Sequence, residues 1–320
     1  MHALIPPLAL LLERLVGYPP QVVERIGHPV MWIGWLIGAL EQRLNTPERS
    51  GSARRWLGCG ALLVVLAVTL GAALVLQGWA RSLPGGIFVE IVLATPFLAQ
   101  KELGRAVGAV ASALGQSLAA GREAVSHIVG RDPERLDEAG VARAAVETLA
   151  ESTSDGVVAP WFWIVIGGLP GIALYKAINT ADSMIGHLDA RYRDYGWSAA
   201  RLDDLVNLVP ARLTAVLVVV ACFFLGGASP SGAWRAAMQD ARKHRSPNSG
   251  WPEAAFGGAL GFSLGGPRSY GGAVVDLAVM GGGRAALDGG DIERALGLYW
   301  ITLNVVLAVS GVAGVMMWVG

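Results

Sequence analysis

The chain has 320 residues, of which 53% are hydrophobic and 16% are charged, and its formal net charge is zero. Soluble domains carry about 25% charged residues, so this composition disfavours a soluble globular protein. A balanced net charge also argues against a nucleic-acid partner. Cys59 and Cys222 lie inside apolar runs, which is typical of small hydrophobic side chains and not of a disulfide or a metal pair.

Charge-free apolar runs are the main structural signal, because about 20 apolar residues form a helix that crosses a ~30 Å hydrocarbon core. The N-terminal run MHALIPPLALLLERLVG lacks a basic start and a cleavage site, so we expect it to be kept as a short membrane-dipping helix. The sequence predicts an all-α, polytopic integral membrane protein in which residues 1–320 form a single membrane-embedded domain. The predicted spans are about 56–80, 84–100, 157–175, 213–234 and 295–320.

Long polar segments separate these spans. Residues 41–55 form a basic loop, and 101–156 predict an amphipathic helix, a turn at 130–133 and a second helix over about 134–153. Counts of Arg and Lys place these two segments and residues 235–294 on the cytoplasmic side.

The run 157–175 contains two prolines and three glycines, so it is either a full span or a broken, re-entrant helix. This choice decides which side of the membrane the charged segment 176–212 faces. If 101–156, 176–212 and 235–294 all contribute to catalysis, they should converge on one cytoplasm-facing pocket.

The first candidate site lies in AVETLAESTSDGVVAP. Glu147, Glu151 and Asp155 recur every four residues, which places them on one face of a helix. Three neighbouring carboxylates repel each other unless a cation lies between them, and oxygen ligands of this kind suit Mg²⁺ together with substrate phosphates. We therefore predict these three residues as metal ligands, the alternative being a solvated acidic face.

The second candidate site follows the run at 157–175. Lys176 and Asn179 are three residues apart on a predicted helix, and Asp182 is on a neighbouring face. Asp204 lies three residues before Asn207. We predict Lys176, Asp182 and Asp204 as catalytic residues and Asn179 as a cofactor-binding residue, although Lys176 could simply snorkel to the interface.

Three arginines of the same region are predicted to hold anions, because a guanidinium binds phosphate and carboxylate groups bidentately. They are Arg191, Arg201 and Arg212. Arg212 stands at the start of a predicted span, where a charge is costly and marks either function or snorkelling.

The third candidate site is ARKHRSPNSGWPEAAFGG. The residues Ser246–Gly250 have strong turn chemistry, and their N–H groups could form an anion nest beside His244 and Arg245. We predict His244 as catalytic and Ser246, Asn248 and Glu253 as cofactor-binding residues. His28, which precedes Pro29 at the start of a predicted helix, is a further cofactor-binding candidate, with helix capping as the alternative.

Several common motifs are missing from the sequence. There is no G-x-x-x-x-G-K-[ST], so ATP would not be held by a Walker loop. No zinc-ligand spacing and no nucleophile elbow occur either.

Together these segments resemble the adenosylcobinamide-phosphate synthase family, the membrane proteins of cobalamin biosynthesis of CbiB/CobD type. The resemblance covers nearly the whole chain and follows the family's order. In the family, an Asn usually stands where this chain has Ser152. The segments that carry it are GHPVMWIG, AVETLAESTSDGVVAP, YKAINTADSM, RYRDYGWSAARLDDLVNLVPARLTA, SPNSGWPEAAFGGALG and LGGPRSYGG.

The resemblance implies an ATP- and Mg²⁺-dependent ligase in the inner membrane. Its substrates would be the corrinoid adenosylcobyric acid and (R)-1-aminopropan-2-ol phosphate or the free aminopropanol, and its product adenosylcobinamide phosphate. The lipid bilayer would surround it, and candidate protein partners are a second copy of the chain or other enzymes of cobalamin assembly. Two other classes stay open: a Mg²⁺-dependent intramembrane prenyl or phosphoryl transferase, and a non-catalytic corrinoid-binding membrane protein.

Overall fold

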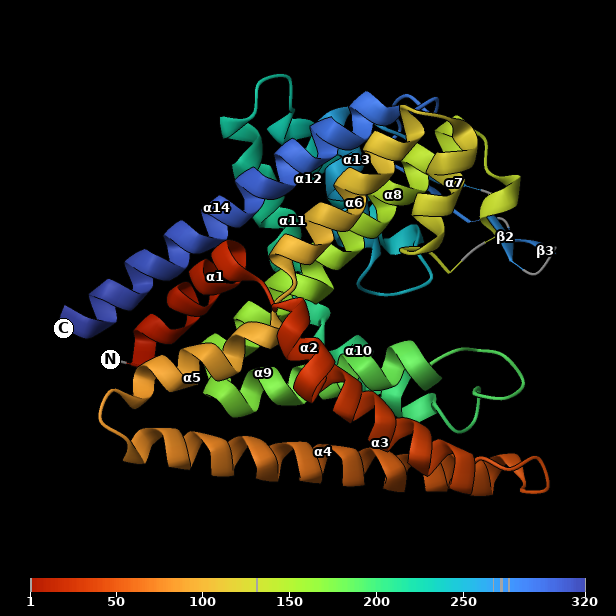
Figure 1. Cartoon of the computed structure of the whole chain (residues 1–320). Helices are drawn as coiled ribbons and strands as arrows, with labels where there is room; N and C mark the ends of the chain where they lie inside the picture. The colour runs from red at the N-terminus through yellow and green to blue at the C-terminus, as the bar shows by residue number, and fades with distance from the viewer. Residues whose placement is uncertain (1, 131, 267, 271–272, 276, 320) are drawn as a thin grey trace. The chain divides into compact units, whose positions relative to one another are not determined.

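The computed structural model describes residues 2–130, 132–266, 268–270, 273–275 and 277–319 (Figure 1). The chain divides into two compact units, each built from segments that are distant in sequence. The first unit comprises Met1–Ala99, Ala159–Asn207 and Ser310–Gly320, and the second comprises Gln100–Val158 and Leu208–Val309.

The first unit is helical. Its longest helix, α4, is capped by the Ser50 hydroxyl, which accepts a hydrogen bond from the N–H of Ala53 at 3.3 Å. Helix α3 runs alongside α4 (Figure 1). The helices are α1 (Ile5–Val16), α2 (Pro20–Ile26), α3 (Pro29–Leu44), α4 (Gly51–Ser82), α5 (Gly86–Ala94), α9 (Ala159–Ile185) and α10 (Trp197–Val206), with 3₁₀ turns at His2–Leu4 and Thr95–Phe97.

Helix α9 is broken inside the predicted span 157–175. Gly168 has φ 59° and ψ −148°, outside the helical region, and Pro170 follows two residues later. A proline inside a helix lacks the N–H donor and clashes with the preceding turn, and glycine tolerates positive φ. The structure therefore has the broken helix, one of the two alternatives that the sequence left open, and the half of α9 after the break carries Lys176, Asn179 and Asp182.

In the second unit, α6 packs against α7 and α8, and α13 packs against α8, α11 and α12. A single turn of π-helix at Ser154–Val158 follows α8. The helices are α6 (Gln100–Leu114), α7 (Leu118–Ser126), α8 (Glu138–Thr153), α11 (Leu208–Ala221), α12 (Pro230–Asp240), α13 (Gly250–Leu260) and the part of α14 (Gly289–Val319) up to Val309, with 3₁₀ turns at Pro133–Arg135, Cys222–Phe224 and Ala241–Lys243.

Four short strands pair in the second unit and are the departure from a purely helical chain. β1 (Leu264–Gly265) is antiparallel to β4 (Val279–Met280), with Leu264 opposite Met280. β2 (Arg268–Tyr270) is antiparallel to β3 (Ala273–Val275). Parts of the family segment LGGPRSYGG, including Gly271 and Gly272, lie outside the described residues.

Among the described residues, three helical stretches are long and apolar enough to cross a membrane: Gly51–Ser82, Glu138–Ile185 and Gly289–Met317. Trp197–Val206 and Leu208–Phe224 pass the same test only as a pair. These helices confirm the predicted helical membrane fold.

Two predicted spans are wrong in their extent. Residues 84–100 form the nine-residue α5 and a 3₁₀ turn, because Pro96 ends the helix. The span at 213–234 ends at Phe224, and Pro230 opens a separate helix, α12.

Candidate functional site

Residues of α8 and α13 form a polar cluster in the second unit. The Ser249 hydroxyl donates a hydrogen bond to Oε1 of Glu151 at 2.8 Å. One turn earlier, Oε1 of Glu147 accepts a 2.6 Å hydrogen bond from the N–H of Gly265. Glu147 is buried, whereas Glu151 is exposed. We use the name α8–α13 cluster for five residues: Glu151 of α8, Asp155 of the π turn, Arg212 of α11, and Ser249 and Trp251 at the start of α13.

The three predicted metal ligands do not converge on one point. Within the part of the chain that the structure describes, no group of three His, Cys, Asp or Glu side chains could hold a metal ion. Glu147 is engaged by the Gly265 backbone, and Asp155 lies on the π turn, which breaks the four-residue spacing assumed for a regular helix. Because protein-bound Mg²⁺ often uses only one or two carboxylates plus substrate phosphates, the exposed Glu151 and the half-buried Asp155 still suit it chemically.

Arg212 lies on α11, the helix that packs on the π turn carrying Asp155 and on α13. Its guanidinium lies over the Trp251 ring, 4.7 Å from the centroid, and Nη1 donates to the carbonyl of Leu208 at 2.6 Å. Stacking holds the guanidinium plane, so its remaining N–H groups can meet a planar anion. Trp251 is two residues beyond Ser249. That Arg212 holds an anion stays a prediction.

The turn Ser246–Gly250 uses its own N–H groups. Nδ1 of His244 accepts from the N–H of Ser246 at 3.0 Å, and the Ser246 hydroxyl accepts from the N–H groups of Asn248 and Ser249 at 3.2 and 3.3 Å. These three N–H groups are therefore not directed at a ligand, and the predicted anion nest is not formed in this conformation. The turn instead fixes the start of α13 and the position of the Ser249 hydroxyl.

Nε2 of His244 lies 3.7 Å from Oε1 of Glu253, which is only 2% exposed. In the tautomer whose Nδ1 accepts from Ser246, the ring proton is on Nε2 and faces this carboxylate. Asn248 is also buried, at 5% exposed. The structure therefore buries both Asn248, which lies within the turn, and Glu253, which lies in the first turn of α13.

The first unit contains a second polar group, the Asp203 network. Oδ2 of Asp203 accepts from Nδ2 of Asn207 at 3.0 Å, and Oδ1 accepts from Nδ2 of Asn179 at 3.5 Å. The Tyr175 hydroxyl donates to Oδ1 of Asn207 at 3.0 Å, and Nζ of Lys176 donates to Oδ1 of Asn179 at 3.2 Å. The network joins the second half of α9 to α10, which pack together.

Two further predicted residues are near this network. The negative charge of Asp182 acts on Asp203. The pKa of His28 is lowered by burial, then by the positive charge of Lys176, and the Pro96 carbonyl offsets this only in part. His28 also accepts from the N–H of Val30 at 3.2 Å through Nδ1, as a helix cap. The sequence grouped Lys176, Asn179 and Asp182 on one helix, and the structure adds His28, which was a separate candidate, to their surroundings.

In α10, the network contains Asp203, whereas the prediction named its neighbour Asp204. Asp204 lies 3.6 Å from Arg201 as an ion pair, whereas Asp203 is buried in the network. The signal for Asp203 was its four-residue separation from Asn207, one turn apart on the helix. Tyr175 was missed as well, because a tyrosine at the end of an apolar run resembles an ordinary core residue.

The remaining predicted anion holders have protein partners. Arg191 makes a bidentate contact with Glu41, at 3.0 Å from Nε and 2.9 Å from Nη2. Burial raises the pKa of Glu41, but the hydrogen bonds and charge of Arg191 outweigh it, so the pKa is lowered overall. Arg191 therefore fastens the segment after α9 to α3, and Arg201 pairs with Asp204.

Comparison with known proteins places the chain in a family. A family model described as CobD/Cbib protein matches residues 6–299. The chain is 48% identical over 306 residues to cobalamin biosynthesis protein CobD of Brucella anthropi, covering 93% of this chain and 92% of that protein. It is 46% identical over 311 residues to the protein of the same name from Rhodobacter capsulatus, covering 96% of each. No solved structure matches the chain. The chain belongs to the CobD/Cbib family of cobalamin biosynthesis proteins.

Proposed function

We propose that this protein is an ATP- and Mg²⁺-dependent ligase of the inner membrane. It joins the free carboxylate of adenosylcobyric acid to the amine of (R)-1-aminopropan-2-ol phosphate, or of free aminopropanol. With the phosphorylated amine, the product is adenosylcobinamide phosphate. The family relationship supports a place in cobalamin biosynthesis, and the apolar helices support a membrane location.

A carboxylate is a poor electrophile, so amide formation needs activation. ATP would supply the phosphoryl group that turns the carboxylate into an acyl phosphate, releasing ADP. The amine then displaces inorganic phosphate as the new C–N bond forms, and the amine loses a proton. The chain's part is to position the reactants and to balance the charge that develops on the transferred group.

The α8–α13 cluster suits the phosphoryl-transfer step. Glu151 and Asp155 provide oxygen ligands of the kind that Mg²⁺ prefers, and Arg212 provides a held guanidinium for a phosphate oxygen. The observation that carries the proposal is the hydrogen bond from Ser249 to Glu151. Ser249 lies two residues before Trp251, on whose ring the Arg212 guanidinium stacks. These contacts bring a carboxylate, a hydroxyl and a cation together from α8, α13 and α11.

The Asp203 network suits a role with the amine substrate. A carboxylate held by two amides and near Lys176 could accept the proton that the attacking ammonium group must lose. His28, whose pKa is lowered, provides a neutral imidazole in the same neighbourhood.

The direct test uses the purified full-length chain in lipid nanodiscs with adenosylcobyric acid, aminopropanol phosphate, ATP and Mg²⁺. We expect adenosylcobinamide phosphate by mass spectrometry and one ADP and one phosphate per product. Omitting ATP should abolish the product. Corrinoid binding without product or ATP consumption would instead support a non-catalytic carrier. Transfer of a prenyl or phosphoryl group to the corrinoid without amide formation would overturn the ligase.

A further inference from the structure

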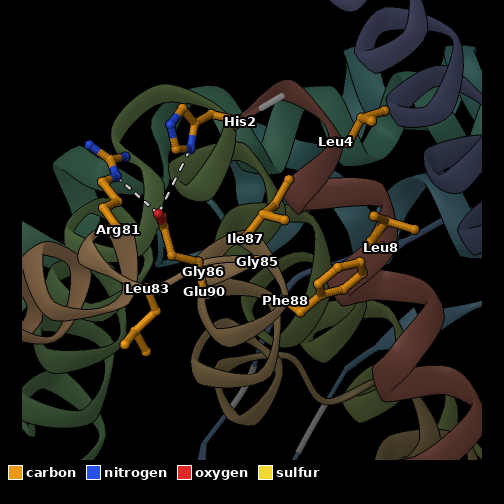
Figure 2. Close-up of a pocket in the computed structure, with 10 residues that line it drawn as sticks. All are labelled: His2, Leu4, Leu8, Arg81, Leu83, Gly85, Gly86, Ile87, Phe88 and Glu90. Carbon is orange, nitrogen blue, oxygen red and sulfur yellow. Dashed lines mark hydrogen bonds and ion pairs between the residues drawn. The ribbon is translucent and has the colours of Figure 1, made fainter.

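A cavity of about 600 Å³ lies in the first unit, beside the loop that joins α4 to α5 (Figure 2). None of the residues discussed above lines it. Its wall is mainly apolar, with an arginine, a histidine and one carboxylate at one end. The apolar side chains are Leu4, Leu8, Leu83, Ile87 and Phe88, and the polar ones are His2, Arg81 and Glu90.

Glu90 organises the polar end of the cavity. It is 1% exposed, and its Oε1 accepts from Nε of Arg81 at 2.9 Å while Oε2 accepts from Nε2 of Gln77 at 3.2 Å. Nδ1 of His2 lies 3.8 Å from the same Oε1, and Figure 2 shows His2 and Arg81 both directed at it. Because the bond to Glu90 uses only Nε, the terminal N–H groups of Arg81 can serve an anion, and its guanidinium is already oriented.

Two tryptophans of α4 indicate the depth of the cavity in the bilayer. Trp56 and Trp79 are 77% and 53% exposed and 23 residues apart, with no charged residue between them. At 1.5 Å per residue they are about 34 Å apart along the helix, the spacing of two aromatic belts at the surfaces of a bilayer. Arg81 and Leu83 follow Trp79 directly, so the cavity stands at the depth of lipid head groups.

The two ends of α4 differ in charge. Residues 41–55 carry four arginines, whereas residues 80–90 carry only Arg81. The loop beside the cavity therefore adds little positive charge besides Arg81. Phospholipids are present in both leaflets, so a lipid phosphate reaches the cavity whichever way α4 crosses the membrane.

We propose that this cavity binds the phosphate of a phospholipid head group. Arg81, with His2 as a second donor, holds the phosphate, Glu90 positions both side chains, and the apolar wall accepts the adjoining acyl chain. The apolar wall and the depth in the membrane favour a lipid over a free phosphate ester. The proposal is independent of the ligase reaction.

Binding can be measured by native mass spectrometry of the full chain in detergent with three short probes below their micelle concentrations. Dioctanoylphosphatidylglycerol has both phosphate and acyl chains, glycerol 3-phosphate has only the phosphate, and dioctanoylglycerol has only the chains. We expect saturable binding of the first probe, at least about tenfold tighter than either of the others. Arg81→Gln should weaken that binding about tenfold.

Arg105→Gln is the matched control, because it also removes an arginine from a Glu–Arg pair, here with exposed Glu102 in the second unit. It should bind the lipid like the wild type. As Arg81→Gln leaves a buried carboxylate and could fail to fold, Leu8→Trp provides a second variant that fills the cavity and keeps the ion pair. Equal binding of dioctanoylglycerol, full competition by glycerol 3-phosphate, or undiminished binding to folded Leu8→Trp would each overturn the proposal.

Discussion

The Glu147 carboxylate accepts a 2.6 Å hydrogen bond from the N–H of Gly265, a residue 118 positions later in the chain. Glu151, one turn further along the same helix face, is exposed and pairs with the Ser249 hydroxyl. Two carboxylates that look equivalent in sequence therefore differ in role. Glu147 ties α8 to the strand segment, whereas Glu151 is available to a ligand.

This difference gives opposite expectations for two matched variants. Glu151→Gln should abolish ligation and leave the melting temperature near that of the wild type. Glu147→Ala should instead lower the stability by about 1.5–3 kcal/mol, because it removes a buried hydrogen bond to a charged group. Thermal melts in detergent and the ligation assay check both. Near-normal turnover of Glu151→Gln would remove Glu151 from the proposed site.

Arg212→Lys should raise the KM for ATP about tenfold with a smaller change in kcat. Lysine keeps the charge but loses the planar fork and the stacking on Trp251, which contributes about 0.5–2 kcal/mol. Initial-rate kinetics against ATP and against the amine separate the two substrates. Arg201→Lys is the control, since that residue pairs with Asp204 at the surface and should behave as the wild type.

Asp203→Asn should reduce ligation at least about 100-fold, whereas Asp204→Asn should have little effect. The first change removes the carboxylate held by Asn179 and Asn207, and the second only loosens an exposed pair with Arg201. Raising the assay pH should partly rescue Asp203→Asn, because more amine is then already deprotonated. An equal loss of ligation in both variants, with no recovery at higher pH, would show that the changes disturb helix α10 and do not remove a proton acceptor.

The Arg191–Glu41 contact predicts acid sensitivity of the first unit. The folded-state pKa of Glu41 is lowered from 4.5, so its stabilising contribution is fully present above pH 4.5 and is lost as the pH falls through the folded pKa. The melting temperature of the wild type should therefore fall below about pH 4.5 more than that of Arg191→Gln. Parallel pH profiles of the two proteins would contradict this assignment.

The sidedness of residues 176–212 stays a prediction that thiol labelling can decide. Single cysteines at Ala190 and Ser198, with Cys59 and Cys222 replaced, should react with an impermeant reagent only from the cytoplasmic side. Labelling of both positions from the periplasmic side would exclude a common cytoplasmic site.

The sequence predicted the helices, offered the break in α9 as one of two alternatives and named only part of each polar group, because these features depend on local spacing. Lys176, Asn179 and Asp182 share one region of one helix, so their proximity needs no tertiary information. The expected span at 84–100 was based on its apolar composition alone, whereas Pro96 ends the helix after α5.

What local spacing could not give was the choice among neighbouring groups. Asp203 and Asp204 are adjacent, and only the packing of α10 on α9 decides which is buried. The N–H groups of the turn at Ser246 could likewise bind a ligand or side chains of the turn itself. In the structure they donate to His244 and to the Ser246 hydroxyl. The hydrogen bond between Glu147 and Gly265 joins distant parts of the chain, and no pattern in either segment predicted it.

The interleaving of the two units along the chain bears on how the protein is made. The Ser310 hydroxyl accepts a 3.0 Å hydrogen bond from Nε1 of Trp161, and Ser310–Gly320 belong to the first unit. Domains usually fold in order as they leave the ribosome, but here the first unit is completed only when its last segment has been synthesised. A ribosome that stalls before residue 310 would leave the earliest helices in the bilayer without their final neighbour, where quality-control proteases can reach them.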